Sequence, residues 1–189
     1  MTTKIVLLNG APSSGKDTLA NYLRNSDEFL HWKYANKVRE NAQLFYPQIN
    51  WWDDCIKDTH LDALKGRTPR QILIKIGLMA RTEIDVNIWV DALANEIEEY
   101  QAGLGIDNTF VISDCGFQNE VDVMVDRFGI ENVLLVRIYR EGYTFENDSR
   151  NYVTIQGDWW ETHNNNDINS FLDESADFVN SWLADVVSP

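Results

Sequence analysis

Cysteine and long apolar runs are both scarce in this sequence of 189 residues. Its two cysteines, Cys55 and Cys115, form no Cys-x-x-Cys pair, and no secretory leader is recognisable ahead of the first strand-like segment. No apolar stretch approaches the roughly 20 residues that a membrane-spanning helix needs. We therefore expect a protein of the reducing cytoplasm with no membrane partner, and neither a disulfide-stabilised scaffold nor a membrane protein.

Positive charge is also in short supply. Sixteen Lys and Arg stand against 30 Asp and Glu, which gives a formal net charge of −14 at pH 7. A surface of this average sign repels phosphate backbones, so we expect no long nucleic acid as a partner. The three histidines have no metal-ligand spacing and do not indicate zinc. A hydrophobic content of 44% excludes a disordered acidic chain and favours one folded domain over residues 1–189.

Apolar runs and helical periodicities alternate along the chain. Short apolar runs at 4–8, 109–113 and 132–139 predict buried strands. Helical spacing recurs at 17–24, 70–81, 86–100 and 118–128, and in a last amphipathic segment that begins near Ser170. Strands separated by helices predict an α/β fold with a parallel sheet. The polar, irregular segment at about 140–160 is a candidate lid, because long loops in compact domains are usually functional or disordered.

The segment after the first predicted strand has the pattern of a phosphate-binding loop. Gly10, Gly15 and Lys16 stand at the G-x-x-x-x-G-K spacing, in which backbone N–H groups and a helix N-terminus surround phosphate oxygens. Asp17 replaces the Ser or Thr that normally meets the metal, and a carboxylate is also a good ligand for Mg²⁺. We therefore expect ATP and Mg²⁺ as cofactors. The residues predicted to bind the nucleotide are Gly10, Ala11, Ser13, Ser14, Gly15, Lys16, Asp17 and Thr18.

Arginines should supply the remaining chemistry, because phosphoryl transfer needs positive charge around the transferred group more than it needs an acid or base. Arg137 and Arg140 lie at the end of the third predicted strand, and Arg150 lies in the candidate lid. We expect these three to act in catalysis together with Lys16 and Asp17. Asp114 ends the second predicted strand, at the edge of the sheet where α/β ligands gather. It is a candidate second metal ligand beside Asp17, or an acceptor contact, and a strand-end cap is the alternative.

Five segments, taken in order, resemble the bacteriophage-type deoxynucleoside monophosphate kinases of the P-loop nucleoside-monophosphate kinase group. Residues 10–18 match G-x-x-x-S-G-K-D-T, 34–39 resemble the acceptor-side segment, 68–77 the T-P-R helix, 87–90 the N-x-W segment, and 111–120 the I-S-D turn. The resemblance implies a three-layer P-loop kinase fold with an acceptor-binding helical insertion at about 31–85 and a lid at about 140–160. It also implies the host cell cytoplasm as the location if the protein is viral.

The activity that this resemblance implies is the ATP-dependent phosphorylation of a deoxynucleoside monophosphate to the diphosphate. The family pattern commonly has Arg and Pro where this chain has Gly116 and Gln118, so one cationic contact is either missing or supplied from elsewhere. Trp52 is a candidate for stacking on the acceptor base, with packing under a long loop as the alternative. The candidate acceptor-binding residues are Lys37, Arg39, Arg70, Arg81, Asp114 and Trp52.

Two alternatives remain open at this point. The first is a P-loop kinase that acts on another acceptor, either a small phosphorylated metabolite or a modified base in DNA. The net charge counts against DNA. The second alternative is a regulatory protein that binds nucleotide without transfer, which Asp17 and Gly116 keep open. Monomer and homodimer are both compatible with the sequence.

Overall fold

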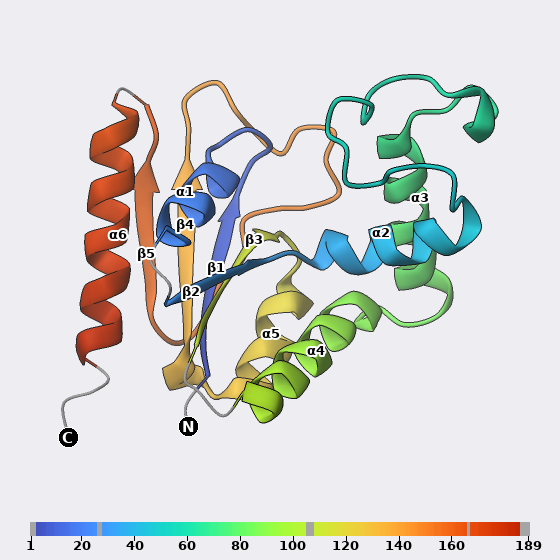
Figure 1. The fold of residues 1–189 in the computed structure, drawn as a ribbon. Helices are drawn as coiled ribbons and strands as arrows, with labels where there is room; N and C mark the ends of the chain where they lie inside the picture. Colours follow the sequence, from blue (N-terminus) through green and yellow to red (C-terminus); the bar gives the residue numbers. More distant parts are fainter. Residues whose placement is uncertain (1–2, 26–27, 105–107, 166, 186–189) are drawn as a thin grey trace. The chain divides into compact units, whose positions relative to one another are not determined.

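Five parallel strands form the sheet of the first of two units, which comprises Met1–Trp32 and Ile97–Pro189 (Figure 1). The computed structural model describes residues 3–25, 28–104, 108–165 and 167–185. The strand order is β2-β3-β1-β4-β5. Because all strands point the same way, their carboxyl ends meet at one edge of the sheet. The strands are β1 (Lys4–Gly10), β2 (Phe29–Trp32), β3 (Thr109–Cys115), β4 (Val133–Tyr139) and β5 (Trp159–His163).

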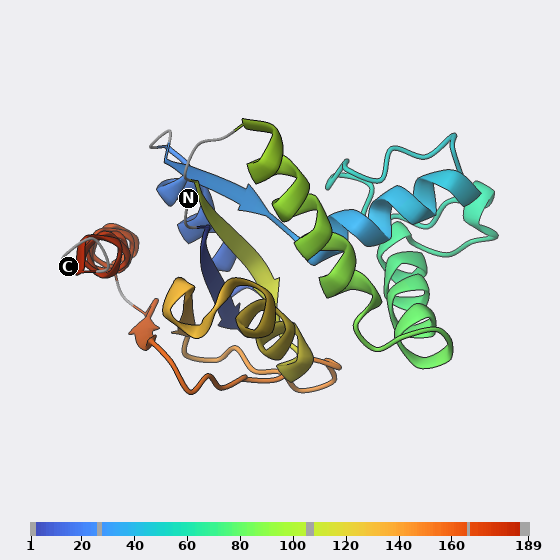
Figure 2. The same ribbon diagram turned by 90° about the horizontal axis from the view of Figure 1, so that it is seen from below.

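Helices cover both faces of this sheet, as Figure 2 shows from below. Helices α1 (Lys16–Leu23) and α6 (Ile168–Asp185) pack on one face, where Val6, Leu134 and Trp182 belong to a single buried cluster. On the other face lie α5 (Gln118–Phe128), the 3-10 turn η2 (Ile130–Asn132) and the end of α4 (Ile88–Leu104). The predicted α/β fold with a parallel sheet is therefore confirmed. None of the helices in the described ranges has the length and apolar character to cross a membrane.

The predicted strands and helices lie within a few residues of those observed, but β2, β5 and helix α2 (Tyr34–Phe45) escaped prediction. The strand β5 begins at Trp159, at the end of the candidate lid at about 140–160. Its two tryptophans alternate between faces, as strand geometry demands. Trp159 is 51% exposed, whereas Trp160 stacks on Phe178 of α6 with the ring centroids 4.7 Å apart.

The second unit, Lys33–Glu96, is helical and includes most of the segment expected to form the acceptor-binding insertion. It contains α2 (Tyr34–Phe45), the 3-10 turn η1 (Asp62–Leu64), α3 (Pro69–Glu83) and the first turns of α4. A capping box begins α3: the Thr68 hydroxyl accepts from the Gln71 N–H, and the Gln71 side chain accepts from the Thr68 N–H. Two buried clusters form its core, one around Trp51 and Leu64 and one around Trp89.

Candidate active site

The loop between β1 and α1 turns sharply at two residues with positive φ, Ser13 (62°) and Gly15 (109°). Gly15 also needs to be glycine because a Cβ there would lie 2.5 Å from Nδ2 of Asn164. That amide donates to the Ser14 carbonyl oxygen at 3.0 Å and so ties the loop to the segment after β5. The loop and the helix that it opens have the arrangement the phosphate-binding motif requires.

Lys16 is buried at the base of this loop, with 8% of its surface exposed. Its Nζ donates to the carbonyl oxygens of Gly10 and Ala11 at 2.6 and 2.7 Å. Burial, and then the positive charge of Arg150, lower the pKa of Lys16 to about 8, although the nearby carboxylates oppose the shift. A lysine desolvated in this way interacts strongly with an anion that reaches it.

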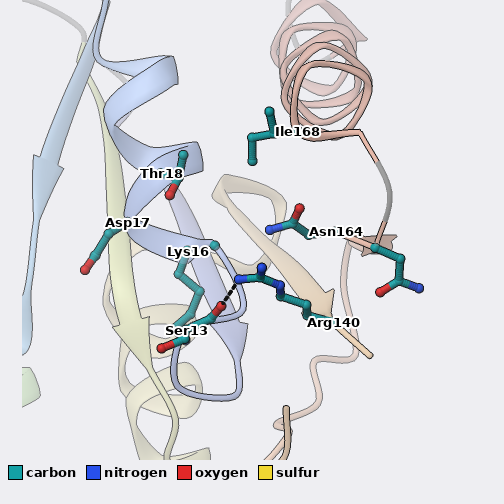
Figure 3. Close-up of a pocket in the computed structure, with 9 residues that line it drawn as sticks. Ser13, Lys16, Asp17, Thr18, Arg140, Asn164 and Ile168 are labelled. Atoms are coloured by element: carbon teal, nitrogen blue, oxygen red, sulfur yellow. Dashed lines mark hydrogen bonds between the residues drawn. The ribbon is translucent and has the colours of Figure 1, made fainter. Parts of the chain in front are cut away.

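A pocket of about 510 Å³ opens in front of the loop (Figure 3). Arg140 reaches it from beyond β4: its Nη1 donates to the Ser13 carbonyl at 2.9 Å, and its guanidinium lies over the Tyr143 ring at 4.6 Å. Three of the lining residues, Asn164, Asn165 and Ile168, were not predicted from the sequence. They follow β5, a strand that was not predicted either. The pocket is lined by Ser13, Gly15, Lys16, Asp17, Thr18, Arg140, Asn164, Asn165 and Ile168.

Arg150 stands in the candidate lid segment with its guanidinium held by Asp148. Its Nε and Nη2 donate to the two carboxylate oxygens at 2.9 and 2.7 Å. The hydrogen bonds to Asp148 outweigh burial and raise the pKa of Arg150, and the charges of Asp114 and Glu120 act in the same direction. The positive charge of Arg150 acts in turn on Lys16 and lowers its pKa, although Arg150 is not among the described residues that line the pocket.

Arg137 is likewise absent from the residues that line the pocket in the described part of the chain. Its Nε donates to the Val153 carbonyl at 2.8 Å, its Nη1 pairs with Glu161 at 2.9 Å, and its guanidinium lies 5.1 Å from the Trp159 ring centroid. These contacts hold the segment before β5 against β4. A catalytic part for Arg137 would require it to leave them.

Asp17 offers the hard oxygen that Mg²⁺ prefers. Its side chain is 61% exposed and lines the pocket beside Lys16. The described ranges contain no cluster of three or more His, Cys, Asp or Glu, so their side chains form no such cage for an ion. Mg²⁺ characteristically combines one or two carboxylates with water and substrate phosphates, and Asp17 fits that requirement. Asp114, half-buried on β3, contributes negative charge near both Lys16 and Arg150.

The candidate acceptor residues other than Asp114 lie in the second unit, and the structure describes their contacts there. Lys37 is paired with Glu40 at 3.0 Å and Glu96 at 2.6 Å. Burial alone would lower the pKa of Lys37, but its hydrogen bonds to the two carboxylates raise it overall. Arg70 forms a two-pronged pair with Asp58, with Nε–Oδ1 at 2.5 Å and Nη2–Oδ2 at 2.9 Å.

The other three acceptor candidates are Arg39, Arg81 and Trp52. Arg39 donates from Nη1 to Asn36 at 3.0 Å, while its buried Nε finds no hydrogen-bond partner in the described residues. Arg81 makes a long contact of 3.4 Å with the Val86 carbonyl. Trp52 is 50% exposed, whereas Trp51 is buried in the core of the unit. Arg39 and Trp52 thus remain suited to contact a ligand.

Comparisons with known proteins identify the fold. No protein-family model matches the sequence, and no curated protein matches it. Among solved structures, an unliganded sugar kinase from Janibacter sp. HTCC2649 superposes with a TM-score of 0.52 at 14% identity, covering 99% of each chain. A gluconokinase from Sinorhizobium meliloti 1021 superposes with a TM-score of 0.52 at 9% identity, covering 98% of each chain. What the chain shares with these proteins is the P-loop kinase-like fold.

Proposed function

We propose that this protein is an ATP-dependent phosphotransferase. The observation that carries the proposal is Lys16, a buried lysine whose ammonium is held by carbonyl oxygens of a phosphate-binding loop that faces the pocket. The loop N–H groups and Lys16 would hold the phosphates of ATP. The base would then lie toward Ile168, at the far side of the pocket from Lys16.

The acceptor that we propose is a deoxynucleoside monophosphate, which becomes a diphosphate. Support comes from the ordered family segments and from the basic residues of the helical unit, above all Arg39, whose buried Nε has no hydrogen-bond partner among the described residues. Arg70 would help to hold the acceptor phosphate, and Trp52, half-exposed, would stack on the base. Lys37 and Arg81 would add positive charge at the acceptor, Lys37 only in exchange for its carboxylate partners.

In the proposed reaction an acceptor phosphate oxygen bonds to the γ-phosphorus while the bond from that phosphorus to the β–γ bridging oxygen breaks. No protein group needs to form a covalent intermediate. Lys16, Arg140 and Arg150 would oppose the negative charge on the transferred group, and Asp148 would keep the Arg150 guanidinium in place. Mg²⁺, when bound, supplies further charge neutralisation at the phosphates, and Asp17 would hold it, with Asp114 nearby as the second carboxylate.

A different acceptor is the second candidate, and the names of two structural neighbours fit it equally well. One is titled a sugar kinase and another a gluconokinase, so their names point to sugar-type acceptors with hydroxyl groups. The same donor loop would serve such an acceptor. The two candidates differ in their product, because a hydroxyl acceptor yields a phosphate ester and a monophosphate acceptor yields a diphosphate.

The deciding experiment incubates the protein with ATP and Mg²⁺ and each common deoxynucleoside monophosphate, ribonucleoside monophosphate and sugar, and separates the products by chromatography. We expect a nucleoside diphosphate from at least one deoxynucleoside monophosphate. Lys16→Ala should abolish it, whereas Arg24→Ala, a charge-matched change just beyond the other end of α1, should not. Nucleotide binding without any product would favour the regulatory alternative, and product from sugars alone would reassign the acceptor.

A further inference from the structure

A chain of short hydrogen bonds ends on the carboxylate of Asp17. The Ser113 hydroxyl donates to Oδ1 of Asp17 at 2.6 Å, and Nε2 of His31 lies 2.7 Å from the same hydroxyl oxygen. Nδ1 of His31 lies 3.1 Å from Oδ1 of Asn21. The chain therefore joins β2, β3 and α1, and it reaches α1 at two residues one turn apart, Asp17 and Asn21.

The direction of the two hydrogen bonds that lead to Asp17 follows from counting protons. A carboxylate only accepts, so the single hydroxyl proton of Ser113 is committed to Asp17. The Ser113 oxygen must then accept from His31, which fixes a proton on Nε2. Nδ1 of His31 faces Oδ1 of Asn21, and Nε2 lies 3.9 Å from Oδ1 of Asp17. The two bonds from Nε2 of His31 through the Ser113 hydroxyl therefore point toward the carboxylate.

Ser113 and His31 are buried and therefore held in place, whereas the Asp17 side chain on its own would be mobile. Ser113 is 1% exposed and the His31 side chain 7%, whereas the Asp17 side chain is 61% exposed. An exposed aspartate has several rotamers of similar energy, and a hydrogen bond from a buried donor selects one of them. Asp17 stands where phosphate-binding loops normally have a hydroxyl, so its oxygen atoms need a defined direction to serve a cation at the phosphates.

We propose that Ser113 and His31 are positioning residues that orient Asp17 toward the magnesium ion of a bound Mg²⁺–nucleotide. This inference rests on the proposed function, because it assumes that the pocket takes the nucleotide with its cation. It concerns two residues that are not among the described residues lining the pocket and that reach it through Asp17. Residues that orient metal ligands through hydrogen bonds typically change metal affinity by about 10–100-fold when they are removed.

The competing explanation is that this chain of hydrogen bonds has only a structural role and holds the edge strand β2 against α1. Loss of such a fastening would weaken every form of nucleotide binding together and lower the melting temperature. Loss of a positioning role would weaken binding only when Mg²⁺ is present. The two explanations therefore separate in a binding experiment that contains no acceptor and involves no turnover.

The test is calorimetric titration with a non-hydrolysable ATP analogue, with Mg²⁺ and with EDTA. We expect Ser113→Ala and His31→Leu to reduce the gain in affinity that Mg²⁺ confers by about tenfold and to leave the affinity in EDTA unchanged. His31→Gln, which keeps an N–H donor near the position of Nε2, should retain most of the gain. Asp17→Asn should lose the gain entirely and sets the upper limit of the effect.

Three results would overturn the proposal: an unchanged gain in Ser113→Ala and His31→Leu, equal losses with Mg²⁺ and with EDTA, or a wild-type protein whose affinity does not respond to Mg²⁺. Melting temperatures of the same variants identify any that fail to fold, and His31→Gln then carries the comparison. Failure of the proposed function has a different signature, since it appears as a lack of product from every acceptor in a protein that still binds Mg²⁺ and nucleotide.

Discussion

The side chain of Arg150 lies directly against the backbone of Gly116. A Cβ built on Gly116 would be 2.6 Å from Cδ of Arg150 and 2.7 Å from its Cβ and Cγ. The Gly116 carbonyl also accepts from the Asn151 N–H at 3.0 Å. The missing side chain at this position therefore gives Arg150 its place beside Lys16. Arg150, from the lid segment, therefore lies next to position 116, at which the family that this sequence resembles commonly has an arginine.

Gly116→Ala should therefore have an effect similar to that of substituting Arg150 itself, because it displaces that side chain. The added methyl group cannot coexist with the arginine stem, so the guanidinium must move away from Lys16. We expect the rate of phosphoryl transfer to fall on the order of 100-fold, the effect of a small misplacement of a catalytic group. The free energy of unfolding should fall by about 1–3 kcal/mol, the usual result of overpacking. Steady-state kinetics and denaturant titration measure the two effects.

Gly103→Ala is the matched control, because a Cβ at that position meets nothing within 4 Å. It should leave the transfer rate unchanged. A Gly116→Ala protein with the wild-type rate would show that Arg150 has no part in transfer, or that it keeps its place by a backbone shift. A crystal structure of the variant would distinguish these two explanations.

Nucleotide affinity should depend on pH through Lys16. Burial and the charge of Arg150 lower its pKa to about 8, whereas bound phosphates favour the ammonium form. Below about pH 8 Lys16 is already charged and the affinity should be constant. As the pH rises from about 8 toward 10.5, binding must take up a proton, so the affinity should fall. Titration calorimetry in two buffers of different ionisation enthalpy measures the proton uptake.

Arg150→Gln should move this pH dependence upward, because removing the second positive charge raises the pKa of Lys16. The affinity itself would fall as well, so the informative quantity is the midpoint of the pH profile and not its height. A midpoint that does not move would mean that burial alone lowers the pKa of Lys16. A flat profile in the wild type would contradict the shift altogether.

Arg39→Ala should weaken binding of the acceptor and leave binding of ATP unchanged. The buried Nε of Arg39 has no hydrogen-bond partner in the described residues, which suits it to an anionic ligand. Loss of a hydrogen bond to a charged group costs about 1.5–3 kcal/mol, so the KM of the acceptor should rise at least tenfold. Arg70→Ala should also raise the KM of the acceptor. Arg67→Ala, an exposed arginine before α3, is the control, and acceptor kinetics unchanged by Arg39→Ala and Arg70→Ala would refute the placement of the acceptor site.

The donor side of the site was predictable from the sequence because its residues are consecutive. A strand, a glycine-rich loop and a helix follow one another, and local geometry alone brings the loop from Gly10 to Thr18 around a phosphate. The helices of the sheet unit were predictable for a similar reason, since each carries its own periodicity. The stripe on α6 that includes Phe171 and Val179 does pack in the main core.

The partners of these residues could not be predicted, because they come from distant segments with weak local signals. The polar pair Asn164 and Asn165 reaches the pocket only because β5 adds to the edge of the sheet, and no alternation in its sequence predicts that strand. Glu120 is a second example. On a helical pattern it could face solvent, yet it is 1% exposed and accepts from the N–H groups of Gly116 and Phe117 at 2.8 and 3.1 Å.

Asn9 should control how firmly the lid segment is attached to the sheet. It is fully buried on β1, and its Nδ2 donates to the carbonyl oxygens of Cys115 and Asn151, both at 3.0 Å. Its Oδ1 accepts from the Val153 N–H at 3.2 Å. No local pattern marks this residue, which ends an apolar run, but its amide satisfies backbone groups of two other segments at once.

Asn9→Ala would leave these buried backbone groups unpaired, and each such group costs about 1–3 kcal/mol. We expect the free energy of unfolding to fall by at least that much, and amide exchange at 151–153 to accelerate more than exchange in β4. Asn9→Asp should be worse still, because a buried carboxylate cannot donate to Cys115 or Asn151. Asn25→Ala, an exposed change after α1, is the control. Equal acceleration of exchange throughout the sheet would mean that Asn9 supports the fold as a whole and does not specifically anchor the lid segment.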